Sequence, residues 1–313
     1  MINHRSLSPV WCGVLSTMAV LSITATVDAA TFIRFDTVLG TVDVELFDTQ
    51  TPLTVENFLH YVDDEHYNYV NDDEDYVNSL IHRSATDFVI QGGGWLLLQA
   101  DPLNLKPVES DPPVTNEPGI SNTRGTIAMA KLGGDPNSAT TQWFFNLTDN
   151  SFLDSSNGGF TVFGQVIGDG MNVVDAIADL PTFPFSSPFS EIPLRDYTTD
   201  DFTNSVPVVG DNLVVINSVT RLTLAGDANG DGQVTGLDLI EVQQNFGQSQ
   251  GSDPGQLTGD ANGDGQVTGL DLIEVQQNFG QSLAAPTIAA IPEPATLALI
   301  GLGGLMLVRR RRA

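Results

Sequence analysis

The sequence predicts a mainly β protein: a closed antiparallel β-barrel capped by two helices, followed by a small α-helical module. Between residues 31 and 224, short runs of alternating apolar and polar residues recur, separated by Gly, Pro, Asn and Asp. Only two stretches of this region have apolar residues at helical spacing. Residues 226–282 hold a 24-residue segment that occurs twice with identical sequence. Many strands with two helices favour a barrel, whereas the duplication indicates a separate unit.

The first elements of the predicted barrel are a hairpin and a helix. Residues 31–36 and 41–47 alternate apolar and polar positions on either side of a Val-Leu-Gly turn. A helix is expected over residues 51–62, where Pro52 occupies the first turn and its missing N–H removes no helical hydrogen bond. One face of this helix is apolar and comprises Val55, Phe58, Leu59 and Val62.

The remaining elements are predicted from similar patterns. Strands are expected at residues 87–91, 125–130, 142–147, 161–166 and 212–222. A second helix is expected over residues 171–180. Residues 63–75 hold seven carboxylates without a ligand spacing, so a solvated acidic loop is favoured over a metal site. Residues 181–212 interleave Pro, Ser and Phe, and they are predicted to form a long surface connection.

The composition of the 313-residue chain restricts its partners. It has 12 Lys and Arg against 39 Asp and Glu, a net charge of −27. A surface this acidic repels phosphate backbones, so nucleic acid is not expected as a partner. Excess carboxylate instead favours divalent cations, above all calcium. The length is sufficient for two folded units.

Residues 1–29 are predicted to be a signal peptide. A polar start precedes an apolar run over residues 10–25, and Val27 and Ala29 are small residues that suit a signal peptidase. The alternative is a membrane-anchoring helix, for which the apolar run is short. Cys12 is the only cysteine and lies in this segment, so the processed chain could form no disulfide.

Residues 292–313 form a second processing signal, after a linker over residues 283–291. A Pro-Glu-Pro sequence precedes an apolar stretch over 295–308 and four arginines. At about 1.5 Å per residue that stretch spans ~21 Å, short of the ~30 Å hydrocarbon core; a tail anchor extended by snorkelling arginines is the alternative. The three parts resemble a PEP-CTERM sorting signal. The resemblance implies transient anchoring in the inner membrane, cleavage by an exosortase-type enzyme, and a periplasmic, surface or extracellular location.

Five short motifs occur in order within residues 31–224. They are IHRSATDFVIQGG at 81–93, IAMA at 127–130, TQWFFNL at 141–147, FLD at 152–154 and FTVFG at 160–164. Together they resemble the cyclophilin family of peptidyl-prolyl cis/trans isomerases. The resemblance covers nearly all of this region and implies an enzyme that acts on proline-containing polypeptides without a cofactor.

The chemistry of X–Pro rotation suits these residue types. Rotation breaks amide resonance, a barrier of about 18–20 kcal/mol, and it needs an apolar pocket and a fixed hydrogen-bond donor but no nucleophile or metal. The resemblance makes Arg83 the catalytic donor, a role that suits its permanently charged guanidinium, with Phe88, Gln91 and Phe144 beside it. It assigns substrate binding to Val89, Ala130, Lys131, Gln142, Phe152, Leu153 and Phe160.

Other interpretations of these residues stay open. The apolar residues could be ordinary barrel core, with Arg83 in a surface ion pair. Asp87 stands four residues after Arg83, and an ion pair between them would partly occupy the catalytic donor. His60, His66 and His82 are not spaced as metal ligands, and His82 is expected to be a buried structural residue.

The duplicated segment carries the pattern of a calcium-binding loop. Each copy places oxygen ligands at loop positions 1, 3, 5, 9 and 12, a sharp-turn glycine at position 6 and a backbone carbonyl at position 7. The predicted ligands of the first loop are Asp227, Asn229, Asp231, Gln233, Thr235 and Asp238. Those of the second loop are Asp260, Asn262, Asp264, Gln266, Thr268 and Asp271. Without a cation such carboxylates repel one another, so a merely solvated acidic loop is the poorer interpretation.

An aspartate at position 12 and a single helix after each loop resemble a type I dockerin, over residues 226–282. The resemblance implies a cohesin-like partner. Leu239, Val242 and Phe246 lie at i, i+3 and i+7 after the first loop, so the two helices are expected to pack through these positions once metal orders the loops. Gly236-Leu237 replaces the polar pair that commonly contacts cohesin.

The predicted function is therefore an exported peptidyl-prolyl isomerase with a calcium-dependent module for protein attachment. The alternative is a non-catalytic protein that binds proline peptides or assembles an extracellular matrix or surface. The intact set around Arg83 favours the enzyme, whereas Asp87 and the attachment module favour the alternative.

Overall fold

The computed structural model describes residues 30–70, 76–250 and 257–283. The predicted signal peptide and sorting tail, and nearly all of the predicted linker, lie outside these residues. Within these three ranges, no helix is long and apolar enough to cross a membrane.

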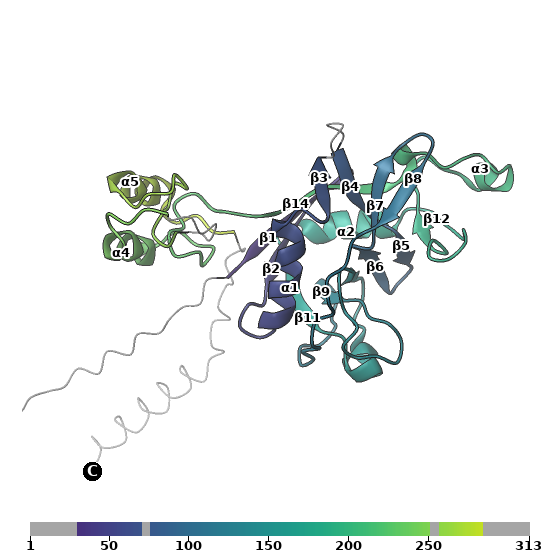
Figure 1. Ribbon diagram of the computed structural model, residues 1–313, viewed down its shortest axis with the longest axis horizontal. Helices are drawn as coiled ribbons and strands as arrows, with labels where there is room; N and C mark the ends of the chain where they lie inside the picture. The colour runs from purple at the N-terminus through teal and green to yellow at the C-terminus, as the bar shows by residue number, and fades with distance from the viewer. Residues whose placement is uncertain (1–29, 71–75, 251–256, 284–313) are drawn as a thin grey trace, which may run out of the picture.

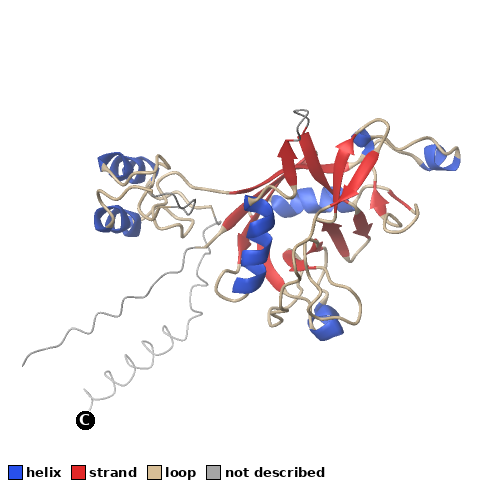
Figure 2. Cartoon of the chain, viewed as in Figure 1, coloured by secondary structure: helices blue, strands red, loops and turns tan. Residues whose placement is uncertain are grey.

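The large unit is built on one antiparallel sheet of twelve strands, drawn among the red arrows in Figure 2. In chain order the strands are β1 (Phe32–Thr37), β2 (Gly40–Leu46), β3 (Asn68–Val70), β4 (Tyr76–Ile81), β5 (Arg83–Ala85), β6 (Val89–Gly92), β7 (Trp95–Gln99), β8 (Asn104–Pro107), β9 (Thr126–Met129), β10 (Trp143–Asn146), β11 (Val162–Ile167) and β14 (Val214–Arg221). Across the sheet their order is β5-β6-β10-β9-β11-β2-β1-β14-β4-β7-β8, and β3 pairs with β4. All seven predicted strands are present. Strands β3, β4, β5, β7 and β8 were not predicted.

The strand pairing does not show the predicted closed barrel, since the order across the sheet runs from β5 at one end to β8 at the other. The end strands of the sheet, β5 and β8, do not pair with each other in the described part of the chain. The N–H of Ser84 on β5 donates instead to the carbonyl oxygen of Glu191, at 2.7 Å. On the other side, the β7–β8 hairpin extends the sheet beyond β4. Strands β4 and β5 are separated only by His82, whose N–H donates to the Gln91 carbonyl oxygen of β6 at 3.1 Å, so both ends of the order from β5 to β4 lie on one stretch of chain.

Two helices cover the sheet at the predicted places: α1 (Pro52–Asp63) and α2 (Gly170–Ala178). Helix α1 contacts β14, and α2 contacts β2, β6 and β11. Between them lies an aromatic core in which the Phe35 ring meets Trp143 edge-on, with centroids 4.9 Å apart, and Phe145 at 5.6 Å. Edge-to-face pairs of this kind add to the free energy gained by burying apolar area.

Residues 181–212 are not the surface connection that was predicted. They form β12 (Thr182–Phe183), β13 (Ile192–Pro193) and α3 (Thr199–Thr203). Together with sheet residues they build a second apolar core of Leu80, Phe183, Ile192, Leu194, Tyr197, Leu213 and Val215. Three short 3₁₀ helices complete the unit: η1 (Ser151–Asp154), η2 (Ser156–Gly158) and η3 (Gly210–Asn212). Apolar residues at irregular spacing produce no period, so pattern analysis could not identify this core.

The duplicated segment holds two helices, α4 (Gly236–Gln244) and α5 (Gly269–Asn278), which Figure 1 shows side by side at the end of β14. The buried residues between them are Ala228, Val234, Val242, Ala261, Val267 and Val275. The expected packing of Phe246 is wrong, because Phe246 is 58% exposed and its copy Phe279 is 59% exposed. Both residues follow the last helical residue, so the i+7 position no longer lies on the helix face.

Candidate active site

One row of residues across neighbouring strands brings together the predicted catalytic groups. In the sheet register, Arg83 on β5 pairs with Gln91 on β6, and Gln91 pairs with Phe144 on β10. Phe144 in turn pairs with Ala128 on β9. Directly paired residues project from the same face of a sheet, so these side chains share one surface. Trp143, the neighbour of Phe144, lies on the opposite face in the main core.

An apolar cluster lies beside this row. Its buried residues are Val89, Ala128, Phe144, Leu153 and Val162. Phe88, Ala130 and Phe160 are partly buried and pack against them. This cluster is separate from the main core, so the apolar residues of the five motifs divide between two faces of the sheet. A partly buried apolar surface of this kind suits a proline ring.

Aromatic side chains form the rim of the apolar cluster. Phe152 is 57% exposed and stacks on Phe88, with ring centroids 5.7 Å apart. The Phe160 ring meets Phe144 edge-on at 5.9 Å, and the Lys131 ammonium lies 4.7 Å from the centroid of the Phe160 ring. Phe152, Phe160 and Lys131, predicted from the sequence to bind substrate, therefore lie beside the same apolar cluster as Phe144.

The main-chain edge of the groove is partly occupied. The Ala130 N–H donates to the carbonyl oxygen of Gln142, at 2.8 Å. The Lys131 ammonium donates to the carbonyl oxygens of Asn157 and Gly159, and burial lowers its pKa. Lys131 therefore fixes the loop beside the apolar cluster, and its ammonium is less available to a bound peptide than the sequence suggested.

Arg83 is paired with a residue that the sequence did not single out. Its Nε donates to Glu191 Oε2 at 2.7 Å, and the two side chains are 31% and 43% exposed. Its two terminal nitrogens have no hydrogen-bond partner within the described ranges. Asp87 makes no ion pair with Arg83; it occupies a turn at φ 55° instead. The guanidinium is thus held at one side, and its terminal N–H groups remain available as donors.

Behind this row lies His82, which is buried as expected. Burial lowers the pKa of His82 to about 4, and the positive charge of Arg83 acts in the same direction. A neutral imidazole is therefore packed next to the charged guanidinium at neutral pH. In front of it, Gln91 Nε2 donates to Gln142 Oε1 at 2.7 Å, which fixes the orientation of both amides.

In the C-terminal module, carboxylates are buried without a cationic partner. Asp227, Asp238, Asp260 and Asp271 are at most 8% exposed, and none belongs to an ion pair among the described residues. Burial raises the pKa of Asp227 to about 6, with repulsion from Asp231 and Asp238 in addition. Backbone N–H groups orient these carboxylates, as where Gly232 donates to Asp227 Oδ2 at 2.7 Å. These ligands are all oxygen atoms, and their buried negative charges need a cation nearby. Both properties fit Ca²⁺.

Comparison with known proteins identifies the large unit. Residues 32–199 match the model of cyclophilin type peptidyl-prolyl cis-trans isomerases. The chain is 40% identical over 166 residues to the peptidyl-prolyl cis-trans isomerase of Acinetobacter baylyi, covering 52% of this chain and 79% of that protein. The chain belongs to the cyclophilin family. Residues 225–280 match the type I dockerin domain, and residues 290–312 match the PEP-CTERM protein-sorting motif.

Two further relatives have the same family name. Peptidyl-prolyl cis-trans isomerase B of Escherichia coli is 37% identical over 180 residues, covering 55% of this chain and 99% of that protein. Peptidyl-prolyl cis-trans isomerase A of Dickeya dadantii is 34% identical over 187 residues, covering 57% of this chain and 89% of that protein. The matched relatives thus account for the cyclophilin unit of this chain.

Sequence analysis missed two positioning residues of the cyclophilin unit. Glu191 lies in the segment that had no recognisable pattern, so no sequence signal pointed to it. Asn150 is buried, and its Nδ2 donates to the Phe88 carbonyl at 3.0 Å and to Asn146 Oδ1 at 2.8 Å. A buried amide that spans two loops holds Phe88 at the apolar cluster. Such a role depends on long-range contacts, which a motif does not contain.

Proposed function

We propose that this cyclophilin is an exported enzyme that isomerises X–Pro bonds in extracytoplasmic proteins, and that its dockerin-like module attaches it to a protein partner when calcium is bound. The row of Arg83, Gln91 and Phe144 beside an apolar cluster is the observation that carries the catalytic part. The PEP-CTERM match supports export.

Catalysis on this surface needs only binding and hydrogen bonding. The proline ring packs on the apolar cluster around Phe144, and Gln91 hydrogen-bonds the peptide backbone. As the amide twists, its nitrogen loses resonance and becomes a hydrogen-bond acceptor, to which a terminal N–H of Arg83 donates. This bond is absent in the planar ground state, so it lowers the barrier instead of merely tightening substrate binding. No proton is transferred and no covalent bond breaks.

The role of Arg83 can be tested by isomerisation of an X–Pro peptide. We expect Arg83→Ala in the full chain to lower kcat/KM by about 10²–10³-fold, the range found when one transition-state donor is removed. Arg34→Ala is the matched control, because Arg34 is also an ion-paired surface arginine. Its Nε lies 2.7 Å from Asp43 Oδ1, and neither residue belongs to the apolar cluster beside Arg83. A folded Arg83→Ala variant with unchanged turnover would contradict the catalytic proposal.

A non-catalytic protein that binds proline peptides is the second candidate. The ion pair between Arg83 and Glu191 favours it, because a paired guanidinium is a weaker donor than a free one. Turnover separates the two candidates. A binder would retain proline peptides at the apolar cluster, lose them on Phe144→Ala, and show no acceleration of isomerisation above the spontaneous rate.

For the C-terminal module we propose two calcium ions, one in each predicted loop. Exposed apolar side chains of α4 and α5 support a protein partner of the cohesin type. These side chains are Leu237, Ile240, Leu270 and Ile273, which are 48–59% exposed. The duplication gives the module two nearly equivalent faces of this kind. Their apolar character means that any cohesin-like partner should offer an apolar surface at these positions.

A further inference from the structure

A cluster of metal-ligand side chains lies at the C-terminal end of α1, away from both sites described above. One ligand atom from each of His60, Asp64 and His66 lies within 4.8 Å of the others. The spacing of His60 and His66 in the sequence did not predict this proximity. His60 and Asp64 are one helical turn apart, and the His66 N–H donates to the Tyr61 carbonyl at 3.0 Å, which turns the chain back toward the helix.

The two ring nitrogens of His60 face different carboxylates. Nδ1 lies 3.0 Å from Asp64 Oδ2, and Nε2 lies 3.0 Å from Asp111 Oδ2. Two zinc ligands at about 2.0–2.1 Å in a tetrahedral arrangement stand roughly 3.4 Å apart, close to the first of these separations. The contact with Asp111 is the arrangement in which a carboxylate holds the second nitrogen of a metal-binding histidine. Asp111 is itself fixed, because its N–H donates to the Tyr61 hydroxyl at 2.8 Å.

His66 has the unmet hydrogen-bonding capacity that a metal ligand would have. Its Nδ1 is buried and has no partner. The ring packs edge-on against Tyr61, with centroids 5.2 Å apart, and its centroid lies 5.5 Å from that of His60. A buried polar atom without a partner is unfavourable, and a metal ion bound to this nitrogen would satisfy it.

We propose that His60, Asp64 and His66 bind one divalent transition-metal ion of the Zn²⁺ type, with Asp111 as the carboxylate that orients His60. Two imidazoles and one carboxylate favour Zn²⁺ over Ca²⁺ or Mg²⁺, which take oxygen ligands. The site therefore differs in metal preference from the calcium loops, and it is independent of the proposed isomerase function. It would join the end of α1 to the turn that follows.

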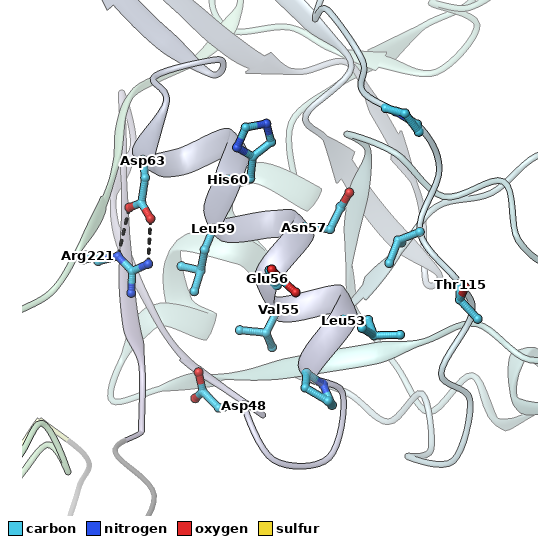
Figure 3. Close-up of a pocket in the computed structure, with 13 residues that line it drawn as sticks. Asp48, Leu53, Val55, Glu56, Asn57, Leu59, His60, Asp63, Thr115 and Arg221 are labelled. Atoms are coloured by element: carbon cyan, nitrogen blue, oxygen red, sulfur yellow. Dashed lines mark hydrogen bonds and ion pairs between the residues drawn. The ribbon is translucent and has the colours of Figure 1, made fainter. Parts of the chain in front are cut away.

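Nearby residues supply a matched control. Figure 3 shows His60 on the outer face of α1 and, beside it, Asp63 turned the other way toward Arg221. Asp63 binds Arg221 at 2.7 Å and 2.9 Å, so this adjacent carboxylate is outside the cluster. Asp63→Asn should leave zinc binding unchanged, whereas His60→Ala and His66→Ala should weaken it by at least about 100-fold. Asp111→Asn should weaken it by about 10–100-fold, as found for such supporting carboxylates.

The test is a Zn²⁺ titration of the untagged full chain against a chromophoric chelator, in Ca²⁺ sufficient to saturate the loops. We expect one Zn²⁺ per chain, lost in both histidine variants and kept in Asp63→Asn. Replacement by Co²⁺ should give the visible absorption of a tetrahedral ion, absent in His66→Ala. Circular dichroism checks that the variants are folded. No Zn²⁺ binding by the wild-type chain, or equal binding by the folded histidine variants, would overturn the proposal.

Discussion

The cyclophilin groove and the duplicated calcium module build their sites in opposite ways. In the groove, residues from 83 to 191 meet through strand register and one long segment, so each functional side chain depends on the whole sheet. In the module, all ligands of one predicted site fall within twelve consecutive residues, and the same twelve occur again. A site made by tertiary structure should lose function at single positions while the fold persists. A site made by a local loop should lose function and fold together.

Removing calcium should have the largest effect on stability. It tests whether the sites made by local loops lose function and fold together. With four buried carboxylates uncompensated, we expect the module to unfold in a chelator while the cyclophilin unit stays folded. Thermal unfolding followed by circular dichroism, with Ca²⁺ and with EDTA, should show one transition that depends on calcium and one that does not.

The control for this experiment is the double variant Asp238→Asn with Asp271→Asn. It removes the buried position-12 carboxylate of each loop, and its unfolding should no longer respond to calcium. If EDTA instead unfolded both units together, the two regions would not be independent. One contact between them exists, because Gly232 of the first loop packs against the Phe32 ring of β1.

Acidification should destabilise the cyclophilin unit through His82. The folded pKa is about 4 against 6.5 for a free histidine, so the unfolded chain binds the proton first as pH falls. The stability due to neutral His82 is complete above about pH 6.5 and is lost as pH falls toward 4, by up to about 3 kcal/mol. Urea unfolding across this range should show a shallower pH dependence for His82→Gln than for the wild-type chain. An identical pH dependence would contradict the assignment.

The same contrast explains what the sequence could predict. The seven predicted strands and both sheet-covering helices are present because hairpins and amphipathic helices are local patterns. The motifs around Arg83, Phe88 and Phe144 identified the groove, because their order and spacing resemble those of the cyclophilin family. Closure of the barrel stays a prediction, since the strand pairing does not show it, and what the local patterns missed is the partner at the edge of β5. That partner, Glu191, comes from residues 181–212, whose apolar side chains have no regular period.

The cluster on α1 was missed for a related reason. His60 and His66 are six residues apart, a spacing that places them on different faces of a continuous helix. The helix ends at Asp63, however, and the chain then turns through Glu65 at φ 59°. The position of a helix end is the part of a prediction with the largest error, so the proximity of these residues could not be inferred from spacing.

The smallest expected effect tests how the groove positions its donor. Glu191 holds only Nε of Arg83, so it should orient the guanidinium while the terminal N–H groups act on the substrate. We expect Glu191→Ala to lower kcat/KM about tenfold, near 1.4 kcal/mol, and Glu191→Gln to lower it less because the amide oxygen can still accept the hydrogen bond. Asp87→Asn is the matched control. Asparagine tolerates the positive φ of this position, and the Asp87 carboxylate makes no ion pair with Arg83. An increase in activity on Glu191→Ala would mean that the ion pair restrains the donor. The proposed role of Glu191 in orienting the guanidinium would then be contradicted.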